Sequence, residues 1–189
     1  MSAAELLQDA QQMLADPMRN PRYCTASDAI QDRYARHLRS EYGVLCLSAV
    51  RDDILMWSHY ADFHRGVCLE FDGAAKLMQH AFPVSYSKER PSIHMIRDSN
   101  ETAMEKSLRT KSDHWKYERE WRLLSYPNGP GVMQLRPESL TGIVIGAEAT
   151  SGTVDLVRGW VRQRTIPMKV YQARKNRHAF ALDIVEVEL

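Results

Sequence analysis

Two stretches of the sequence decide how the chain can fold: ILMWSHYADFHRGVCLEF at Ile54–Phe71 and KSDHWKYEREWRLL at Lys111–Leu124. They contain three of the four tryptophans and three of the seven histidines. Val67 and Leu69 alternate with polar or small residues at the end of the first stretch, which predicts a strand. The second stretch ends in alternating charged and apolar residues, which also predicts a strand. The other apolar runs are expected to complete a sheet around these two segments.

The apolar runs between turn residues predict an α+β fold, in which a single domain has one mixed β-sheet with flanking helices. Four runs are expected to share this sheet: Val44–Val50, Val67–Phe71, Arg119–Ser125 and Ile143–Ile145. Further strand residues are expected at 82–86, 117–118, 132–135, 168–173 and 180–187, and helices at 2–15, 27–41, 54–62, 98–111 and 153–163, the last with Val154, Val157, Trp160 and Val161 inward. We divide the chain into an N-terminal helical segment, residues 1–42, and an α+β core, residues 43–189.

The composition argues against several classes of protein. The 189 residues carry a formal net charge of +1, with 44% apolar and 26% charged residues, so charge alone favours neither nucleic-acid nor membrane binding. The first residues lack the basic start and apolar core of a signal peptide, and no apolar run is long enough to span a membrane. Cys46 and Cys68 lie in apolar runs, where reduced thiols are expected. We therefore expect a cytoplasmic protein of bacterial type.

Charged side chains alternate along the strand predicted in the second stretch. A period of two places Glu118, Glu120 and Arg122 on one face. Burying two carboxylates and a guanidinium is costly unless they pair or face a cleft. One interpretation is a solvated sheet face on which Arg122 pairs with a glutamate. The other is a cleft wall in which one glutamate, with Glu120 as the candidate, is a catalytic base or electrostatic stabiliser. Lys111 and Trp115, four residues apart, would join Glu118 and Arg122 as substrate-binding residues of that cleft.

The short helix predicted in the first stretch carries three side chains of interest. Trp57 is either a core anchor or a substrate-binding residue. His59 and Tyr60 are candidate catalytic residues. The charge of histidine changes near neutral pH, which suits His59 to proton transfer, although a partly buried structural histidine is the alternative. Ser48, at the end of the preceding strand, is a further candidate for substrate binding. We expect these residues to line one cleft with Glu120.

Other kinds of site have little support in the sequence. No metal site is expected, because His59 and His64 are five residues apart and no Cys-x-x-Cys pair exists. There is no Gly-rich phosphate loop and no nucleophile elbow. The segment from Leu156 to Leu182 has seven basic residues and no acidic one, which is typical either of a face for nucleic acid or an acidic protein, or of an ordinary solvated surface. The sequence specifies neither the substrate nor the oligomeric state.

Four motifs carry a resemblance to a known family: CLS at Cys46–Ser48, LMWSHYADFHRGVCLEF at Leu55–Phe71, Val84-x-Tyr86, and KSDHWKYEREWRLL from Lys111. In this combination the chain resembles the bacterial domains grouped as domain-of-unknown-function family 2971, over roughly residues 43–146. That family usually begins with an extra N-terminal strand and an Asn-Asp-Pro-Phe loop, and neither is visible in this sequence. The resemblance implies the location of a site and no particular reaction.

A second likeness, to ADP-ribosyltransferases, rests on the order of three features. These are a strand ending in Ser48, a short helix with Tyr60, and a late strand with Glu120. The likeness implies NAD as the cofactor and a transition-state role for Glu120, but the first-strand Arg or His of those enzymes has no clear match here. One hypothesis is therefore an ADP-ribosyltransferase-like transferase acting in bacterial conflict, as a toxin or in defence, or in stress. The other is a non-catalytic binding or regulatory module that contacts a nucleic acid or an acidic partner through the basic C-terminal third.

Overall fold

The computed structural model describes residue 36 and residues 40–93, 98–125 and 129–189. The chain divides into two compact units, Met1–Gly43 with Ser125–Gly131, and Val44–Leu124 with Val132–Leu189. The helices expected at residues 2–15 and 27–41 lie outside the described residues, apart from positions 36, 40 and 41. The predicted division at residue 42 therefore stays a prediction. The elements that follow belong to the second unit, apart from the end residues Gly43 and Ser125.

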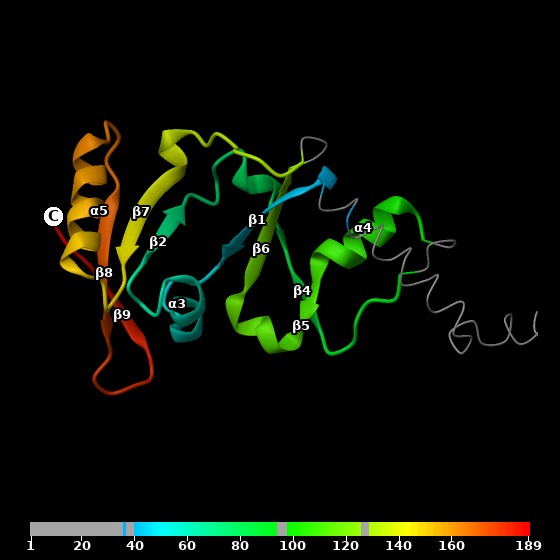
Figure 1. Ribbon diagram of the computed structural model, residues 1–189, viewed down its shortest axis with the longest axis horizontal. Coiled ribbons are helices and arrows are strands. Elements are labelled where there is room, and N and C mark those ends of the chain that lie inside the picture. The colour runs from blue at the N-terminus through cyan, green and yellow to red at the C-terminus, as the bar shows by residue number, and fades with distance from the viewer. Residues whose placement is uncertain (1–35, 37–39, 94–97, 126–128) are drawn as a thin grey trace, which may run out of the picture. The chain divides into compact units, whose positions relative to one another are not determined.

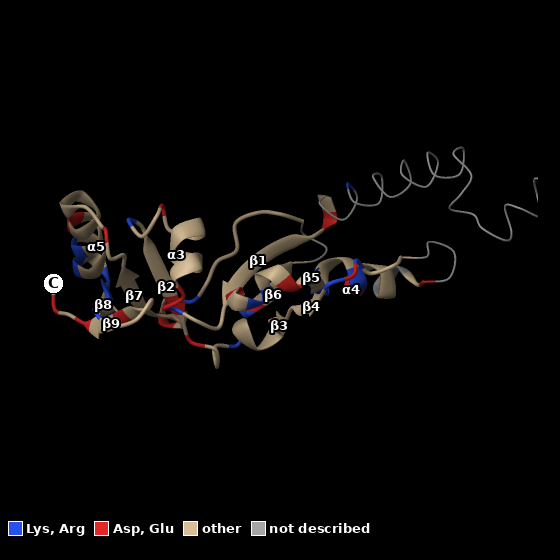
Figure 2. Cartoon of the chain, turned by 90° about the horizontal axis from the view of Figure 1, so that it is seen from below, with Lys and Arg blue, Asp and Glu red and all other residues tan. Residues whose placement is uncertain are grey.

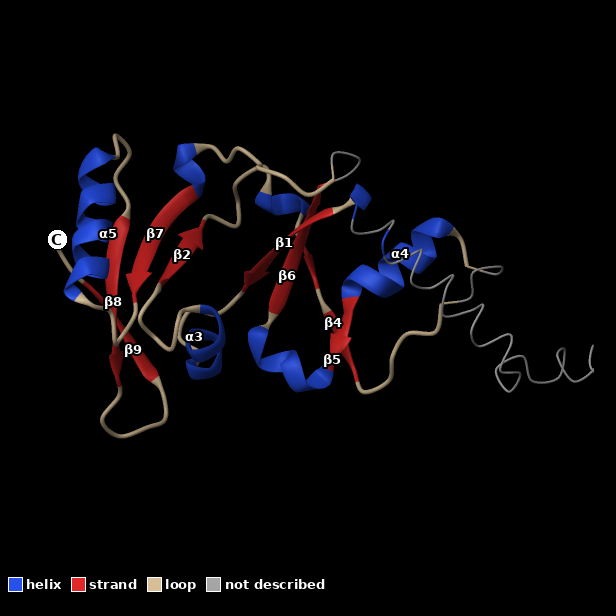
Figure 3. Ribbon diagram, in the orientation of Figure 1, coloured by secondary structure: helices blue, strands red, loops and turns tan. Residues whose placement is uncertain are grey.

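Short helices and strands alternate along the described chain (Figures 1 and 3). The strands are β1 (Gly43–Ser48), β2 (Val67–Phe71), β3 (Phe82–Pro83), β4 (Ser85–Ser87), β5 (Thr110–Ser112), β6 (Glu120–Ser125), β7 (Leu140–Ile145), β8 (Lys169–Lys175) and β9 (Leu182–Glu186). The helices are α3 (Ile54–Tyr60), α4 (Asn100–Arg109) and α5 (Ser151–Gln163), with the 3₁₀ helices η2 (Met78–His80), η3 (Asp113–Glu118) and η4 (Pro137–Ser139). This mixture of helices and strands confirms the predicted α+β class.

The strands form three sheets, of order β1-β6-β3, β2-β7-β8-β9 and β4-β5. The prediction that four of the runs share one sheet is wrong, since β1 and β6 lie in one sheet and β2 and β7 in another. An apolar run indicates a strand but does not specify its partner.

The run Ile143–Ile145 in β7 is at most 1% exposed, whereas Val44 and Leu45 in β1, an equally apolar run, are 42% and 39% exposed.

Two helices cover opposite faces of the four-stranded sheet. Helix α5 packs Val157 against Ile143 and Ile145, and α3 packs Trp57 against Val144. Successive residues of a strand point to opposite faces, which explains why neighbours in β7 meet different helices.

Trp160 of α5 does not face inward, and that prediction is wrong, because the side chain is 44% exposed. At 100° per residue it lies roughly 90° from the centre of the stripe formed by Val154, Val157 and Val161. The stripe that covers the sheet is therefore narrower than the sequence suggested.

The second stretch is less extended than predicted. Residues 113–118 form η3, so the strand starts at Glu120 and not at Tyr117. Between them Arg119 has φ 44° and ψ 51°, a left-handed conformation that turns the chain and interrupts strand alternation. The strand expected at residues 82–86 divides into β3 and β4, which belong to different sheets, and the described residues 132–135 contain no strand.

A strained turn follows α3. Asp62–His64 have φ values of 45°, 52° and 67°, which is costly for residues with a side chain. Two backbone hydrogen bonds of 3.0 Å tie the turn to the end of β7, from Gly146 N to Gly66 O and from Glu148 N to His64 O. A Cβ atom on Gly146 would overlap the carbonyl group of His64, so this close approach requires glycine.

Within the residues that the structure describes, none of the helices combines the length and apolar character needed to cross a membrane.

Candidate functional site

Four charged side chains form a buried charge cluster, with Lys111 from β5, Glu118 from η3, and Glu120 and Arg122 from β6. Lys111 Nζ donates hydrogen bonds to Oε2 of Glu118 and, at 2.9 Å, to Oε2 of Glu120. Arg122 donates from Nε to Glu120 Oε1 at 2.7 Å and from Nη2 to Oε2 at 3.3 Å. The side chains of Glu118 and Glu120 are 3% and 4% exposed. Lys111 and Arg122 are 21% and 15% exposed, so two positive and two negative groups pair in a largely buried position.

The backbone around the charge cluster explains why these residues meet. Glu120 and Arg122 are two residues apart in β6 and share a face, as predicted. The left-handed Arg119 lies between the end of η3 and this strand. The backbone N–H of Glu120 donates to Tyr86 Oη of β4 at 2.8 Å, and Arg122 Nη1 donates to the carbonyl of Leu108 in α4 at 2.5 Å. Helix α4 and the small β4-β5 sheet are thereby fixed to β6.

Glu118 connects the cluster to two more of the predicted site residues. Tyr60 Oη, at the end of α3, donates to Glu118 Oε1 at 2.8 Å. Ser48 Oγ, at the end of β1, donates to the backbone carbonyl of Glu118 at 2.7 Å. Tyr60 and Glu120 thus lie on the same side of the structure, joined through Glu118 and Lys111.

The cluster holds fixed charges near neutral pH. Burial alone would raise the pKa of Glu120, but hydrogen bonds from Arg122, Lys111 and Cys46 outweigh it and lower the pKa to about 2. Burial alone would lower the pKa of Lys111, but its bonds to the two glutamates raise it to about 12. Burial, followed by the hydrogen bond to Glu118, raises the pKa of Tyr60 to about 12. Glu120 therefore stays ionised while Lys111 and Tyr60 stay protonated.

Cys46 and Tyr86 are two contacts of the cluster that the sequence analysis missed. Cys46 is exposed as a residue, but partial burial of its thiol, and then a hydrogen bond to Glu120, raise the pKa of that thiol. Both residues lie in motifs that carried the family resemblance, and Cys46 is two positions from Ser48 on the same strand. That strand alternation was the signal that could have identified Cys46.

Four rings next to the charge cluster form what we call the aromatic surface: His59, Tyr60, Trp115 and Tyr117. The ring centroids are 6.3 Å apart for His59 and Tyr60, 5.9 Å for His59 and Trp115, and 6.0 Å for Trp115 and Tyr117. Tyr60 is 62% and Trp115 36% exposed. Lys111 Nζ lies 5.1 Å from the Trp115 ring centroid, so a cation–π contact joins the surface to the cluster.

Trp57 is the predicted site residue that the structure does not bring to the cluster. Its side chain is 3% exposed and packs in the core between α3 and the four-stranded sheet. Its Nε1 donates to the carbonyl of Arg51 at 2.9 Å, which satisfies the buried indole N–H. Of the two interpretations of Trp57, the core anchor is the one that the packing supports.

The basic residues of the C-terminal third lie on α5 and β8 (Figure 2), in the loop between these elements and in the loop that follows β8. Lys169 pairs with Glu186 at 3.1 Å and Lys175 with Glu148 at 2.5 Å. Arg164 donates to backbone carbonyls, including that of Pro137 at 2.8 Å. Several of the basic residues therefore already have partners within the chain.

In the described part of the chain, no three His, Cys, Asp or Glu side chains are placed to hold a metal ion.

The family comparison covers both the charge cluster and the aromatic surface. A family model described as "Protein of unknown function (DUF2971)" matches residues 56–123. This region belongs to the DUF2971 family. The match confirms the resemblance found from the motifs, and the DUF2971 region includes all four residues of the cluster and all four rings. Neither the curated proteins nor the solved structures gave a match, and the likeness to ADP-ribosyltransferases has no support in these comparisons.

Proposed function

We propose that this protein, of which residues 56–123 match the DUF2971 model, is a non-catalytic binding module, in which the charge cluster is structural and the aromatic surface contacts a planar ring of a partner. The observation that carries the proposal is the saturation of the two carboxylates. Glu118 accepts from Tyr60 and Lys111, and Glu120 accepts from Lys111 and Arg122, so all four carboxylate oxygens are bonded within the chain.

A transferase of the ADP-ribosyltransferase type would use this glutamate differently. In its favour, Ser48 and Tyr60 both bond to Glu118, the residue that shares Lys111 with Glu120. However, Glu120 would have to reach the substrate, and its side chain is 4% exposed and neutralised by two cations. A carboxyl with a pKa of about 2 is also a weak base, far from the value that suits proton transfer near pH 7. The geometry therefore favours the binding module over the transferase. NAD would be the cofactor of the transferase, the less favoured function.

The aromatic surface suits a nucleobase as the planar ring. Exposed aromatic rings stack with bases of any sequence, and nearby cations attract the phosphates that accompany them. Lys116 and Arg119 are exposed and lie at the end of η3, within four residues of Trp115. The proposed partner is a single-stranded nucleic acid or a nucleotide, bound here and not through the partly paired basic third.

Fluorescence titration tests this proposal. Wild-type protein, Trp115→Ala and the control Trp160→Ala are titrated with AMP, UMP, NAD and a short single-stranded RNA. Stacking contributes about 1–3 kcal/mol per base, so Trp115→Ala should weaken binding by about 5-fold to 150-fold, while Trp160→Ala should match the wild type. The proposal fails if no ligand binds, or if Trp115→Ala binds as the wild type does. Consumption of NAD that Glu120→Gln abolishes without loss of stability would instead establish the transferase.

The bacterial origin, the cytoplasmic location and the role in conflict or stress stay predictions.

A further inference from the structure

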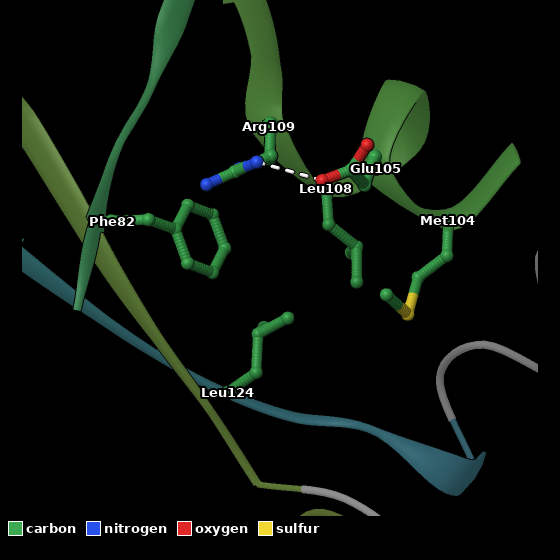
Figure 4. A pocket seen from close by; sticks show the side chains of 6 residues that line it. All are labelled: Phe82, Met104, Glu105, Leu108, Arg109 and Leu124. Carbon is green, nitrogen blue, oxygen red and sulfur yellow. Dashed lines mark hydrogen bonds and ion pairs between the residues drawn. The ribbon is translucent and has the colours of Figure 1, made fainter. Parts of the chain in front are cut away.

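A pocket apart from the aromatic surface lies between α4 and the β6-β3 pair (Figure 4). Its volume is about 190 Å³. It is lined by four apolar side chains and one ion pair: Phe82, Met104, Leu108 and Leu124, with Glu105 and Arg109. Figure 4 shows the apolar side chains around the space and the ion pair at one side of it.

The pocket is held open by contacts already described. Leu124 is two residues beyond Arg122 in β6 and so shares its face of the sheet. The bond from Arg122 Nη1 to the carbonyl of Leu108 holds α4 against that face. Phe82 of β3 lies directly opposite Arg122 of β6, so its side chain is on the same face of the sheet as Arg122 and Leu124. The pocket therefore rests on the charge cluster and does not need a ligand to form.

The size of the pocket restricts what it can take. An apolar cavity of about 150 Å³ can hold a benzene molecule, and pockets for drug-sized ligands measure about 300–1,000 Å³. A volume of about 190 Å³ therefore suits one ring or one branched alkyl group, which is the size of a single large amino-acid side chain.

The ion pair supplies one charge of each sign next to this apolar space. Arg109 Nη1 donates to Glu105 Oε1 at 2.7 Å, and the guanidinium carbon lies 4.6 Å from the Phe82 ring centroid. The side chains of Arg109 and Glu105 are 43% and 51% exposed, so solvent reaches both. A guanidinium has five N–H donors and a carboxylate two acceptor oxygens, which leaves each group able to bind a further charge. An exposed pair of this kind is weak, so a ligand can rearrange it at little cost.

We propose that this pocket binds a free apolar α-amino acid such as leucine, methionine or phenylalanine. The side chain fills the space among Met104, Leu108 and Leu124, the ammonium group bonds Glu105, and the carboxylate bonds Arg109. A free amino acid presents both charges together with one apolar side chain. A peptide N-terminus has only the ammonium group and a C-terminal residue only the carboxylate, so neither matches both sides of the ion pair. The inference does not depend on the proposed function of the aromatic surface.

Calorimetric titration of the full chain with L-leucine, L-methionine and L-phenylalanine tests the proposal. We expect saturable binding, weakened about tenfold or more by Arg109→Gln and by Glu105→Gln, because each removes a charge-assisted hydrogen bond. Arg158→Gln breaks a comparable helical ion pair on α5, with Asp155, and should bind as the wild type does. Melting curves without ligand establish that each variant is folded.

Two blocked ligands separate recognition of the charges from recognition of the side chain, and they need no variant. N-acetyl-leucine lacks the ammonium group and leucinamide lacks the carboxylate, so both should bind at least about tenfold more weakly than leucine. Absence of saturable binding by all three amino acids would overturn the proposal. Equal binding of leucine and both blocked forms would also overturn it, since the ion pair would then play no part.

Discussion

Glu120→Gln keeps the size of a buried side chain and removes its charge, so it isolates what the carboxylate contributes to the fold. Arg122 and Lys111 then lose an ionised partner inside the cluster. The pKa of Glu120 falls from the ordinary 4.5 to about 2 on folding, which at about 1.4 kcal/mol per pKa unit corresponds to ~3 kcal/mol of stability. Removing one partner of a buried ion pair costs ~3–5 kcal/mol in other proteins, in agreement with this figure.

The size of this loss depends on pH. A carboxyl group whose pKa is lowered by folding contributes its stability above the unfolded-state pKa and loses it as the pH falls through the folded-state value. Wild type and Glu120→Gln should therefore differ by ~3 kcal/mol at pH 7 and converge between pH 4.5 and about 2. Urea unfolding followed by tryptophan fluorescence at several pH values measures the difference. Glu148→Gln is the control, because Glu148 is an exposed partner of Lys175 and contributes little. A Glu120→Gln variant as stable as wild type at pH 7 would refute the reasoning.

Three further predictions test other parts of the structure. Tyr60→Phe removes the hydroxyl that donates to the buried Glu118 and should lower the free energy of unfolding by ~1–2 kcal/mol in the same urea assay, and no change would mean that this hydrogen bond is not formed in solution. Gly146→Ala should lower the free energy of unfolding by ~2 kcal/mol or more in thermal melts, because its methyl group would overlap the turn. Gly159→Ala in α5 meets no neighbour and should raise it by up to ~1 kcal/mol. Equal melting curves of the two variants would contradict the close approach of Gly146 to the turn. Trp57→Ala should cost ~3–5 kcal/mol by leaving a cavity in the core, and a loss under ~1 kcal/mol would mean that the indole is not buried.

The local pattern of the sequence was sufficient to predict the face shared by Glu120 and Arg122. Strand alternation depends only on neighbouring residues, so it can be read without knowing the fold. The predicted position of Glu118 on that strand face is wrong, although its side chain does meet the charge cluster. It was expected on the same strand, yet it lies in η3 and reaches the cluster across the left-handed Arg119. No residue type in this segment signals that turn, because tertiary contacts hold it.

The sheet partners and the depth of burial were not predictable in the same way. The sequence around β1 is as apolar as that around β7, but only β7 lies between two helices. Both Trp57 and Trp160 sit near helical stripes, and only the packing distinguishes the core residue from the exposed one. The pocket beside α4 depends on β3 and β6 meeting that helix, which no local pattern in the sequence contains.

The most direct test of the structural charge cluster is the titration of the Glu120 carboxyl carbon by ¹³C NMR, assigned by comparison with Glu120→Gln. The account predicts a midpoint near pH 2, because the carboxylate is bonded on both oxygens by Lys111 and Arg122. A glutamate that transfers protons in catalysis would instead have its pKa raised toward neutral pH. A midpoint above the ordinary value of 4.5 would contradict a closed, structural cluster and would return Glu120 to the role of a catalytic residue.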